Sequence, residues 1–191
     1  MPVTSEPFLI VGLGNPGSTY ALHRHNVGFM ALDEIAACFN VTEFKAKKSS
    51  LLAETRIDGA RVFLLKPLLY MNCSGKPVRQ CMDYYTIGLD NVLVIHDELD
   101  LPFGQMQLKK GGGSAGHNGI KDLKAHCGED FWRIRFGIDH PGDSAHVSSY
   151  VLSNFSKPEI NRVGSALDTL ASHLTEWIIN DTHSFQQSLK K

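Results

Sequence analysis

The chain lacks the features that identify a disulfide-rich, a zinc-binding or a strongly basic protein. Its 191 residues include only four cysteines, scattered and without a C-x-x-C pair, and its formal net charge is −1. Scattered cysteines in a chain of this size argue against a disulfide framework and favour reduced thiols. Because the net charge is near zero, any nucleic-acid site has to be a local patch.

Membrane and targeting signals are also missing. No apolar run is long enough to span a bilayer, and residues 1–7 contain Glu6 but no basic residue, unlike a secretory signal. We therefore expect a cytoplasmic protein. The composition, 42% hydrophobic and 20% charged, is typical of one globular domain. We take residues 1–191 as that domain, with residues 1–7 as an N-terminal extension.

Hydrophobic periodicity predicts that strands and helices alternate along the chain. Strands are expected at residues 8–13, 50–57, 60–66, 91–99, 104–110 and 131–139. Helices are expected at residues 27–39, 74–87, 119–127 and 157–179, followed by a polar tail that frays. Asp58-Gly59 predicts a hairpin between two of the strands. The order predicts a single α/β domain whose twisted, mixed, mostly parallel β-sheet is flanked by helices.

A G-x-G-x-x-G motif follows the first expected strand, and its glycines are Gly12, Gly14 and Gly17. The dinucleotide-binding version of this motif needs a helix that begins at the third glycine. Here a polar stretch rich in His and Arg intervenes, and the helix is expected only after Asn26, which we interpret as its cap. Pro16 also removes a backbone N–H that a phosphate would need. We therefore interpret the glycines as a turn that delivers Asn15 to the edge of the sheet.

Several polar residues fall at loop or strand-end positions, where α/β sheets bind their ligands. They are Asn15, His23, His25, Asn72, His96, Asp97, His117 and Asn118. A neutral histidine takes a proton from water, and a carboxylate behind it fixes its tautomer and stabilises its cation. Asparagine orients a carbonyl or a water without adding charge. Each residue alone is more often a turn former or a helix cap, Asn118 included, but together they predict an active site.

Six blocks of sequence carry a family resemblance: "IVGLGNPG", "RHNVG", "YMNCSG", "HDELDLP", "GGGSAGHNG" and "RIRFGIDHPG". In order and spacing they resemble bacterial peptidyl-tRNA hydrolase, from about residue 9 to past residue 150. The helix expected after residue 157 is similar to the family's C-terminal helix. The resemblance implies hydrolysis of the ester that joins a peptide, or an N-blocked aminoacyl group, to the 3′ end of tRNA. It also implies recycling of tRNA from peptidyl-tRNA released by stalled ribosomes, a monomer, and no metal or cofactor.

The resemblance also implies roles for individual residues. His25 is the general base that activates water, Asp97 orients it, and Asn15 helps to distinguish a blocked from a free amine. The positions that match substrate or tRNA contacts are Tyr20, Tyr70, Asn72 and Asn118.

The 5′ phosphate of tRNA is expected at a pair of cations, Lys109 and Arg135. Lys110 and Arg133 are near them in sequence, but strand neighbours point to opposite faces, so we favour one residue of each pair. Another three cations, Lys45, Lys47 and Lys48, are interpreted as solvated surface charges.

The sequence departs from the family in its glycine-rich loop. Ser114 and Ala115 stand where bulkier or basic residues are frequent, which affects loop mobility or tRNA contacts.

Three alternative functions remain. "GGSAG" fits G-x-S-x-G, so Ser114 is a candidate nucleophile. A metallohydrolase has the candidate ligands His23, His25, His96 and Asp97. An RNA-binding module without catalysis needs only Lys109 and Arg135.

Overall fold

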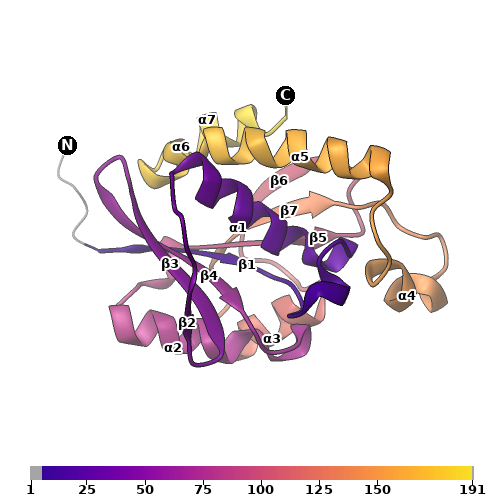
Figure 1. Cartoon of the computed structure of the whole chain (residues 1–191), viewed down its shortest axis with the longest axis horizontal. Coiled ribbons are helices and arrows are strands. Elements are labelled where there is room, and N and C mark those ends of the chain that lie inside the picture. The colour runs from indigo at the N-terminus through magenta and orange to yellow at the C-terminus, as the bar shows by residue number, and fades with distance from the viewer. Residues whose placement is uncertain (1–5, 191) are drawn as a thin grey trace.

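A seven-stranded sheet in the order β2-β3-β4-β1-β5-β7-β6 forms the middle of the molecule (Figure 1). We describe it from a computed structural model, in which residues 6–190 are described, so most of the predicted N-terminal extension lies outside them. The strands are β1 (Phe8–Gly12), β2 (Lys45–Lys47), β3 (Ser50–Ile57), β4 (Ala60–Pro67), β5 (Val92–Glu98), β6 (Met106–Lys110) and β7 (Trp132–Gly137). The four central strands are parallel, whereas β2, β3 and β6 pair antiparallel with their neighbours. The predicted mixed sheet with a parallel core is confirmed.

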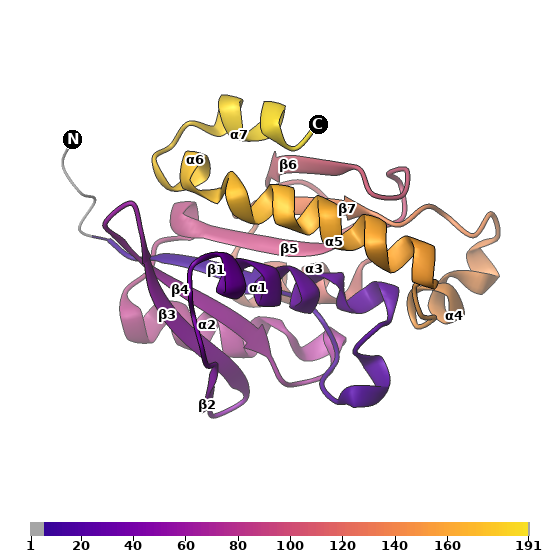
Figure 2. The same ribbon diagram turned by 45° about the horizontal axis from the view of Figure 1, so that its top comes forward.

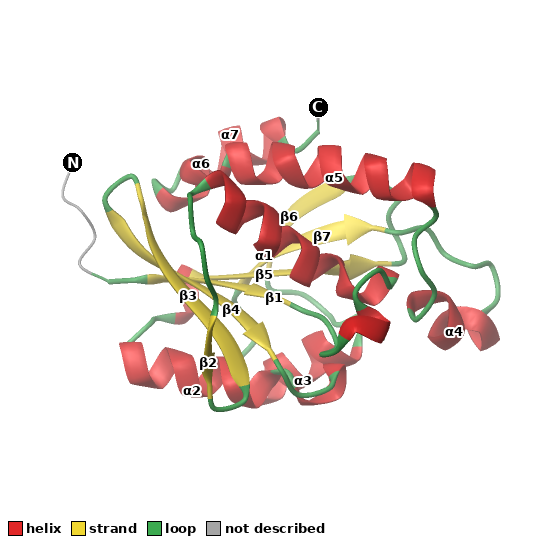
Figure 3. Ribbon diagram, viewed as in Figure 1, coloured by secondary structure: helices red, strands yellow, loops and turns green. Residues whose placement is uncertain are grey.

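Helices cover both faces of the sheet, which makes three layers (Figures 2 and 3). One face is covered by α1 (Val27–Cys38), α5 (Lys157–Ser172), α6 (Leu174–Ile178) and α7 (Thr182–Ser188), and the other by α2 (Gly75–Tyr85) and α3 (Asn118–Cys127). The short helix α4 (Val147–Val151) stands beyond the carboxyl ends of the central strands.

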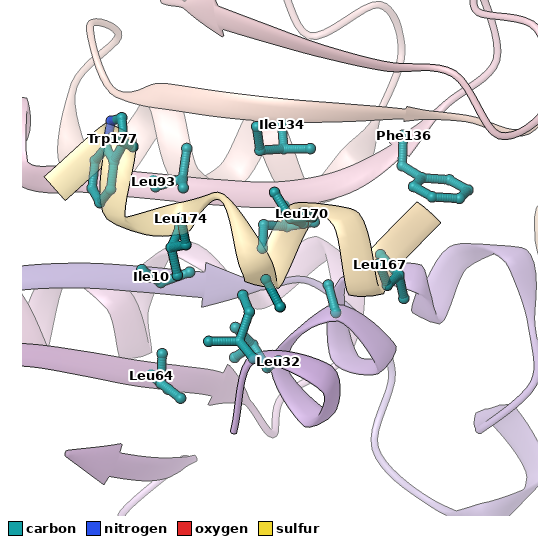
Figure 4. Close-up of a cluster of buried hydrophobic side chains, with 14 of the residues drawn as sticks. Ile10, Leu32, Leu64, Leu93, Ile134, Phe136, Leu167, Leu170, Leu174 and Trp177 are labelled. Carbon is teal, nitrogen blue, oxygen red and sulfur yellow. The ribbon is translucent and has the colours of Figure 1, made fainter. Parts of the chain in front are cut away.

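The central strands are buried because helices cover both of their faces. All residues of β1 and β5 are buried, as their continuous apolar runs predict. On the α5 side, Leu170, Leu174 and Trp177 pack against Ile10 and Leu93 in one hydrophobic cluster (Figure 4). This packing holds the carboxyl ends of the strands, where the polar residues gather, in fixed relative positions.

The β3–β4 hairpin forms where the sequence predicts it. Asp58 and Gly59 both have positive φ, 49° and 79°, as a two-residue turn of the primed type requires. The strand β2 beside β3 was not predicted, since its three residues are exposed and carry two lysines.

The C-terminal region differs from the prediction. The single helix expected over residues 157–179 is divided at His173, and α6 starts anew at Leu174. The tail does not fray, because Phe185 of α7 is fully buried and the Gln186 side chain accepts a hydrogen bond from the backbone of Leu108 at 2.8 Å. Phe185 and the buried Leu189 belong to the core cluster on this face of the sheet, so the segment is docked and does not fray.

The glycines of the opening motif do not start a helix. The 3-10 turns η1 (Ser18–Tyr20) and η2 (Arg24–Asn26) follow Gly17, and α1 begins at Val27. Of the three glycines of the motif, only Gly17 has a positive φ, 105°. A Cβ at Gly12 would lie 2.1 Å from the carbonyl oxygen of Gly28, so this glycine admits the close packing of α1. Because no helix begins at the third glycine, this geometry agrees with the prediction that the motif does not bind a dinucleotide. The prediction that the glycines form a turn holds for Gly17 alone of the three.

Candidate active site

A cleft of about 660 Å³ opens at the carboxyl ends of the parallel strands. Its lining includes six of the predicted site residues: Asn15, His25, Tyr70, Asn72, Asp97 and Asn118. Three others, Tyr20, Lys109 and Arg135, do not line it. The lining also includes Val147, Ser148 and Val151 of α4, with Leu152.

His25 and Asp97 form a buried pair at the floor of this cleft. Nδ1 of His25, on η2, lies 2.9 Å from both carboxylate oxygens of Asp97, on β5. Burial lowers the pKa of His25, but the charge and hydrogen bond of Asp97 outweigh it, so the pKa is raised above the usual 6.5. Asp97 is completely buried; burial raises its pKa, and the histidines it contacts bring it well below its usual range. With Nδ1 donating to Asp97, Nε2 of His25 is left as the acceptor.

His117 is a second histidine on the same carboxylate, and the sequence interpretation missed its role. Its Nδ1 accepts hydrogen bonds from the backbone N–H groups of Gly119 and Ile120, at 3.1 and 3.3 Å. The proton must therefore sit on Nε2, which donates to Oδ1 of Asp97 at 2.8 Å. His117 is thus the N-cap of α3, in place of the predicted cap Asn118, which is the first helical residue.

Asn15 is held by two neighbours that fix the direction of its amide. The side chain of Asn26 accepts from the backbone N–H of Asn15 at 3.0 Å and donates to its carbonyl at 2.9 Å. Asn26 therefore makes this clamp and no side-chain cap of α1, contrary to the prediction. The backbone N–H of Met71 donates to Oδ1 of Asn15 at 2.8 Å, which identifies Oδ1 as the oxygen. The side-chain NH₂ of Asn15 remains as a donor.

The remaining cleft residues lie at its mouth. Asn72, on η3 (Met71–Cys73), and Asn118 are both exposed. Tyr70 is 62% exposed, and its ring meets that of Tyr20 edge to face at 6.3 Å. Tyr20 also contacts His23 in the same geometry, so it supports Tyr70 from behind the cleft wall.

The expected phosphate-binding cations occupy different environments. Lys109 is exposed, whereas Nε of Arg135 donates to buried Glu98 at 2.9 Å, and its other end donates to Gln107. The strand register pairs Lys109 with Arg133, and Arg133 stands two residues from Arg135, so these three share one face. The prediction that strand neighbours point to opposite faces therefore puts Lys109 and Lys110 on different faces. It does not choose between Arg133 and Arg135, which lie on the same face.

Arg133 differs from Arg135 in its task. It is 2% exposed, and its guanidinium donates to the carbonyls of Gly111 and Gly113, the latter at 3.0 Å. It supports the glycine-rich loop from below, so it is not available to a phosphate.

Arg24, between His23 and His25, joins the loop that carries His25 to the segment that follows α4. Its guanidinium donates to Oγ of Ser153 at 2.9 Å, to the carbonyl of Asn154, and to both carboxylate oxygens of Glu159 at 3.0 and 2.9 Å. The backbone N–H of Arg24 also donates to the carbonyl of Ser153 at 3.0 Å. The loop that carries His25 is thus tied to the segment after α4.

The histidines do not make the zinc site considered from the sequence. Among the described residues, the ligand atoms that lie within 4.8 Å of one another belong to His25, Asp97 and His117. His96 is buried and its Nδ1 lies 2.8 Å from the carbonyl of Asp97, so it is not part of this group. A metal on Nε2 of His117 would need Nδ1 to carry a proton, yet Nδ1 accepts two hydrogen bonds. These residues do not fit a metal.

Ser114 lines the cleft but is not on a nucleophile elbow. Such an elbow needs a strand that runs directly into the serine and a helix that leaves directly from it. Here β6 ends at Lys110 and α3 begins at Asn118, with Ser114 in the loop between them.

Comparisons with known proteins agree on one family. A family model described as peptidyl-tRNA hydrolase matches residues 9–191. A protein of that name from Methylobacterium sp. (strain 4-46) is 46% identical over 181 residues, 95% of this chain and 89% of the relative. One from Ehrlichia ruminantium (strain Gardel) is 43% identical over 182 residues, 95% of this chain and 93% of the relative.

The solved structures agree as well. The crystal structure of peptidyl-tRNA hydrolase from Acinetobacter baumannii has a TM-score of 0.92 and 37% identity, and it covers 96% of this chain and 94% of its own. Within residues 6–190, none of the helices has the length and hydropathy needed to cross a membrane.

Proposed function

The chain belongs to the peptidyl-tRNA hydrolase family, and from this premise we propose that it cleaves the ester between a peptide and the 3′ end of tRNA with His25 as general base. The observation that carries the proposal is the fixed direction of His25. Asp97 occupies Nδ1, so the free lone pair is on Nε2, and three side-chain amides, those of Asn15, Asn72 and Asn118, line the same cleft. That arrangement suits the activation of water.

In the proposed reaction, Nε2 of His25 takes a proton as the water oxygen bonds to the ester carbonyl carbon. The cationic imidazole is stabilised by Asp97, as in the histidine–aspartate part of a serine-hydrolase triad. When the tetrahedral intermediate collapses, the bond to the ribose 3′ oxygen breaks and His25 returns the proton to that oxygen. Asn118 is placed to polarise the carbonyl or hold the water, and Asn72 to bind the acyl chain.

Asn15 is proposed to select substrates with a blocked amine. One lone pair of its Oδ1 is taken by the N–H of Met71, so the NH₂ group is the part of the amide left wholly available to a ligand. A donor of this kind pairs with the carbonyl of a peptide bond but not with an ammonium group, which has no acceptor. The amide therefore discriminates by hydrogen-bond type as well as by charge.

On the tRNA side, we propose that Lys109 and Arg135 hold the 5′ phosphate and that Tyr70, supported by Tyr20, offers a ring to the terminal base or the peptide. Arg135 has to share its guanidinium with Glu98 or exchange that partner for the phosphate. The biological role that we propose is the recycling of tRNA from peptidyl-tRNA released by stalled ribosomes. A cytoplasmic monomer that needs no metal stays a prediction.

The test compares hydrolysis of N-acetyl-aminoacyl-tRNA with that of free aminoacyl-tRNA, both in EDTA. The variants are His25→Ala and, as a matched control, His183→Ala, at an exposed position on α7. We expect the unaltered chain and the control to cleave only the blocked substrate, and His25→Ala to lose about 10²- to 10⁴-fold in rate. Binding of tRNA without turnover by the unaltered chain would favour the RNA-binding module.

Two further measurements distinguish the proposed mechanism from a serine nucleophile and from a metallohydrolase. Ser114→Ala should retain activity, whereas its near-complete loss would restore the serine nucleophile. Inactivation by EDTA that Zn²⁺ reverses would restore the metallohydrolase.

A further inference from the structure

A second cavity, of about 260 Å³, lies between helix α2 and the β2–β3 turn. It is at the β2 end of the sheet order, whereas Lys109 is on β6 at the opposite end. The residues that line it include Lys47, Lys48, Leu52, Gln80 and Tyr84. None of these lines the catalytic cleft, so the cavity is a separate feature.

The aromatic side of the cavity is rigid and open. Tyr85 stacks on Phe63 with ring centroids 4.0 Å apart, which fixes its position. Tyr84 meets Tyr85 edge to face at 4.8 Å and is 80% exposed, so its ring stands at the rim with its faces accessible. Beside it, Leu52, Pro77 and Cys81 supply an apolar surface. An exposed tyrosine alone is ordinary, but the exposed Tyr84 ring beside the fixed Tyr85 and an apolar surface suits a flat ligand.

The charge of the cavity is positive. The charged residues that line it are Lys47 and Lys48. The acidic side chains on the adjoining elements are already paired: Glu54 accepts from Arg61 at 2.6 Å, and Asp83 accepts from Nε of Arg79 at 3.1 Å. The two lysines therefore face the cavity with no carboxylate among its lining residues.

We propose that this cavity binds one unpaired nucleotide of an RNA strand. The base lies between Tyr84 and the apolar surface, the adjacent phosphates contact Lys47 and Lys48, and the Gln80 amide offers both a donor and an acceptor to the base edge. The bases of a duplex are already paired and stacked on one another, so a base that lies against Tyr84 has to come from a single strand. An acidic peptide would match the lysines but would leave the open ring and the amide without a partner.

The test uses the full chain and a fluorescein-labelled single-stranded hexa-adenylate RNA, followed by anisotropy. Stacking on an aromatic side chain contributes about 1–3 kcal/mol per base, so Tyr84→Ala should weaken binding by about 5- to 150-fold. Tyr84→Phe keeps the ring and should bind like the unaltered chain. Lys47→Glu with Lys48→Glu should weaken binding and reduce its salt dependence. The matched control is Lys157→Glu, an exposed lysine on α5.

A cross-link distinguishes this cavity from the catalytic cleft, which also faces RNA under the proposed function. A hexamer that carries 5-iodouridine should cross-link to Tyr84 on irradiation, as mapped by peptide fragmentation. Cross-links confined to cleft residues, or unchanged binding in Tyr84→Ala, would overturn the proposal. Hexaglutamate that competes equally well in the unaltered chain and in Tyr84→Ala would show recognition of charge alone and would also overturn it.

Hydrolysis of N-acetyl-aminoacyl-tRNA, measured at saturating substrate in the same variants, should keep its kcat, because neither Tyr84 nor the lysines touch the cleft. Failure of the proposed hydrolase function would show in the unaltered chain. Failure of the RNA site would show only in the hexamer experiments.

Discussion

His117 donates from Nε2 to Oδ1 of Asp97 across 2.8 Å while its Nδ1 caps helix α3. One imidazole therefore joins the start of a helix to the carboxylate that contacts the proposed general base, His25. We expect the two tasks to separate in variants. His117→Ala should lose about 0.5–2 kcal/mol of stability with the cap. His117→Asn retains a capping oxygen and should recover the stability that the cap contributes, but its shorter side chain does not reach Asp97, so it still loses the hydrogen bond to the buried carboxylate.

Both variants should lose activity, since a misplaced catalytic group slows a reaction by up to roughly 10²-fold. The measurements are urea unfolding and kcat for N-acetyl-aminoacyl-tRNA. If His117→Asn keeps full kcat, the contact with Asp97 serves only the fold.

Asp97→Asn should be as damaging as His25→Ala, about 10²- to 10⁴-fold in rate. Because His117 must donate, the oxygen of the introduced amide is directed to it, and the amide NH₂ takes the place of Oδ2, 2.9 Å from Nδ1 of His25. The amide then donates to Nδ1, the proton of His25 moves to Nε2, and the base is blocked. Nitrogen chemical shifts of His25 report this tautomer. A variant with its proton still on Nδ1 and more than a tenth of the activity would contradict the argument.

Activity and stability should change in opposite directions with pH where His25 titrates. Its pKa is raised above 6.5, and only the neutral form is a base, so kcat/KM should rise with pH with a midpoint above 6.5. A raised pKa stabilises the folded state below the unfolded pKa, and this contribution is lost as pH rises through the folded pKa. The difference in Tm between the unaltered chain and His25→Gln should therefore shrink across that window. A difference that is independent of pH would mean that Asp97 does not hold the cation.

Much of this organisation was predictable from the sequence because it is local. The apolar runs of β1 and β5, the Asp58-Gly59 turn and the strand-end position of Asp97 each depend on neighbours in the chain. The convergence of Asn15, His25 and Asp97 follows from parallel strands ending at one edge. The resemblance implied the roles of nine residues, and six of these nine line the cleft.

What was not predictable depends on partners far apart in the chain. Arg24 donates to Ser153, which is 129 residues away, and no periodicity predicts such a contact. The hydrogen bond from Arg135 to Glu98 joins β7 to β5, so it could be predicted only if the pairing of these two strands were known. Residues 157–179 keep a helical pattern through the break at His173, because no proline or glycine marks it.

The Arg24–Glu159 pair should stabilise the molecule far more than an exposed pair does. Their side chains are 10% and 27% exposed, against 47% and 57% for Arg79 and Asp83. Breaking a buried pair costs about 3–5 kcal/mol, and because Glu159 is partly solvated we expect about 2–3 for Arg24→Met. Arg79→Met, the matched control, should lose much less, because solvent screens an exposed pair. Urea unfolding measures both, and equal losses would mean that Arg24 does not anchor the loop of His25.

Lys109 and Arg133 share a face of the sheet, yet their variants should fail in different ways. Lys109 is exposed, so Lys109→Ala should raise KM for N-acetyl-aminoacyl-tRNA, reduce the slope of log Kd for tRNA against log salt by about 1, and leave Tm unchanged. Arg133 is buried and donates to two carbonyls of the glycine-rich loop. Since hydrogen bonds to a charged group contribute about 1.5–3 kcal/mol each, Arg133→Ala should lose at least about 3 kcal/mol of stability and keep the salt slope. If Arg133→Ala instead reduces the salt slope without a fall in Tm, Arg133 contacts the phosphate and the support of the loop is secondary.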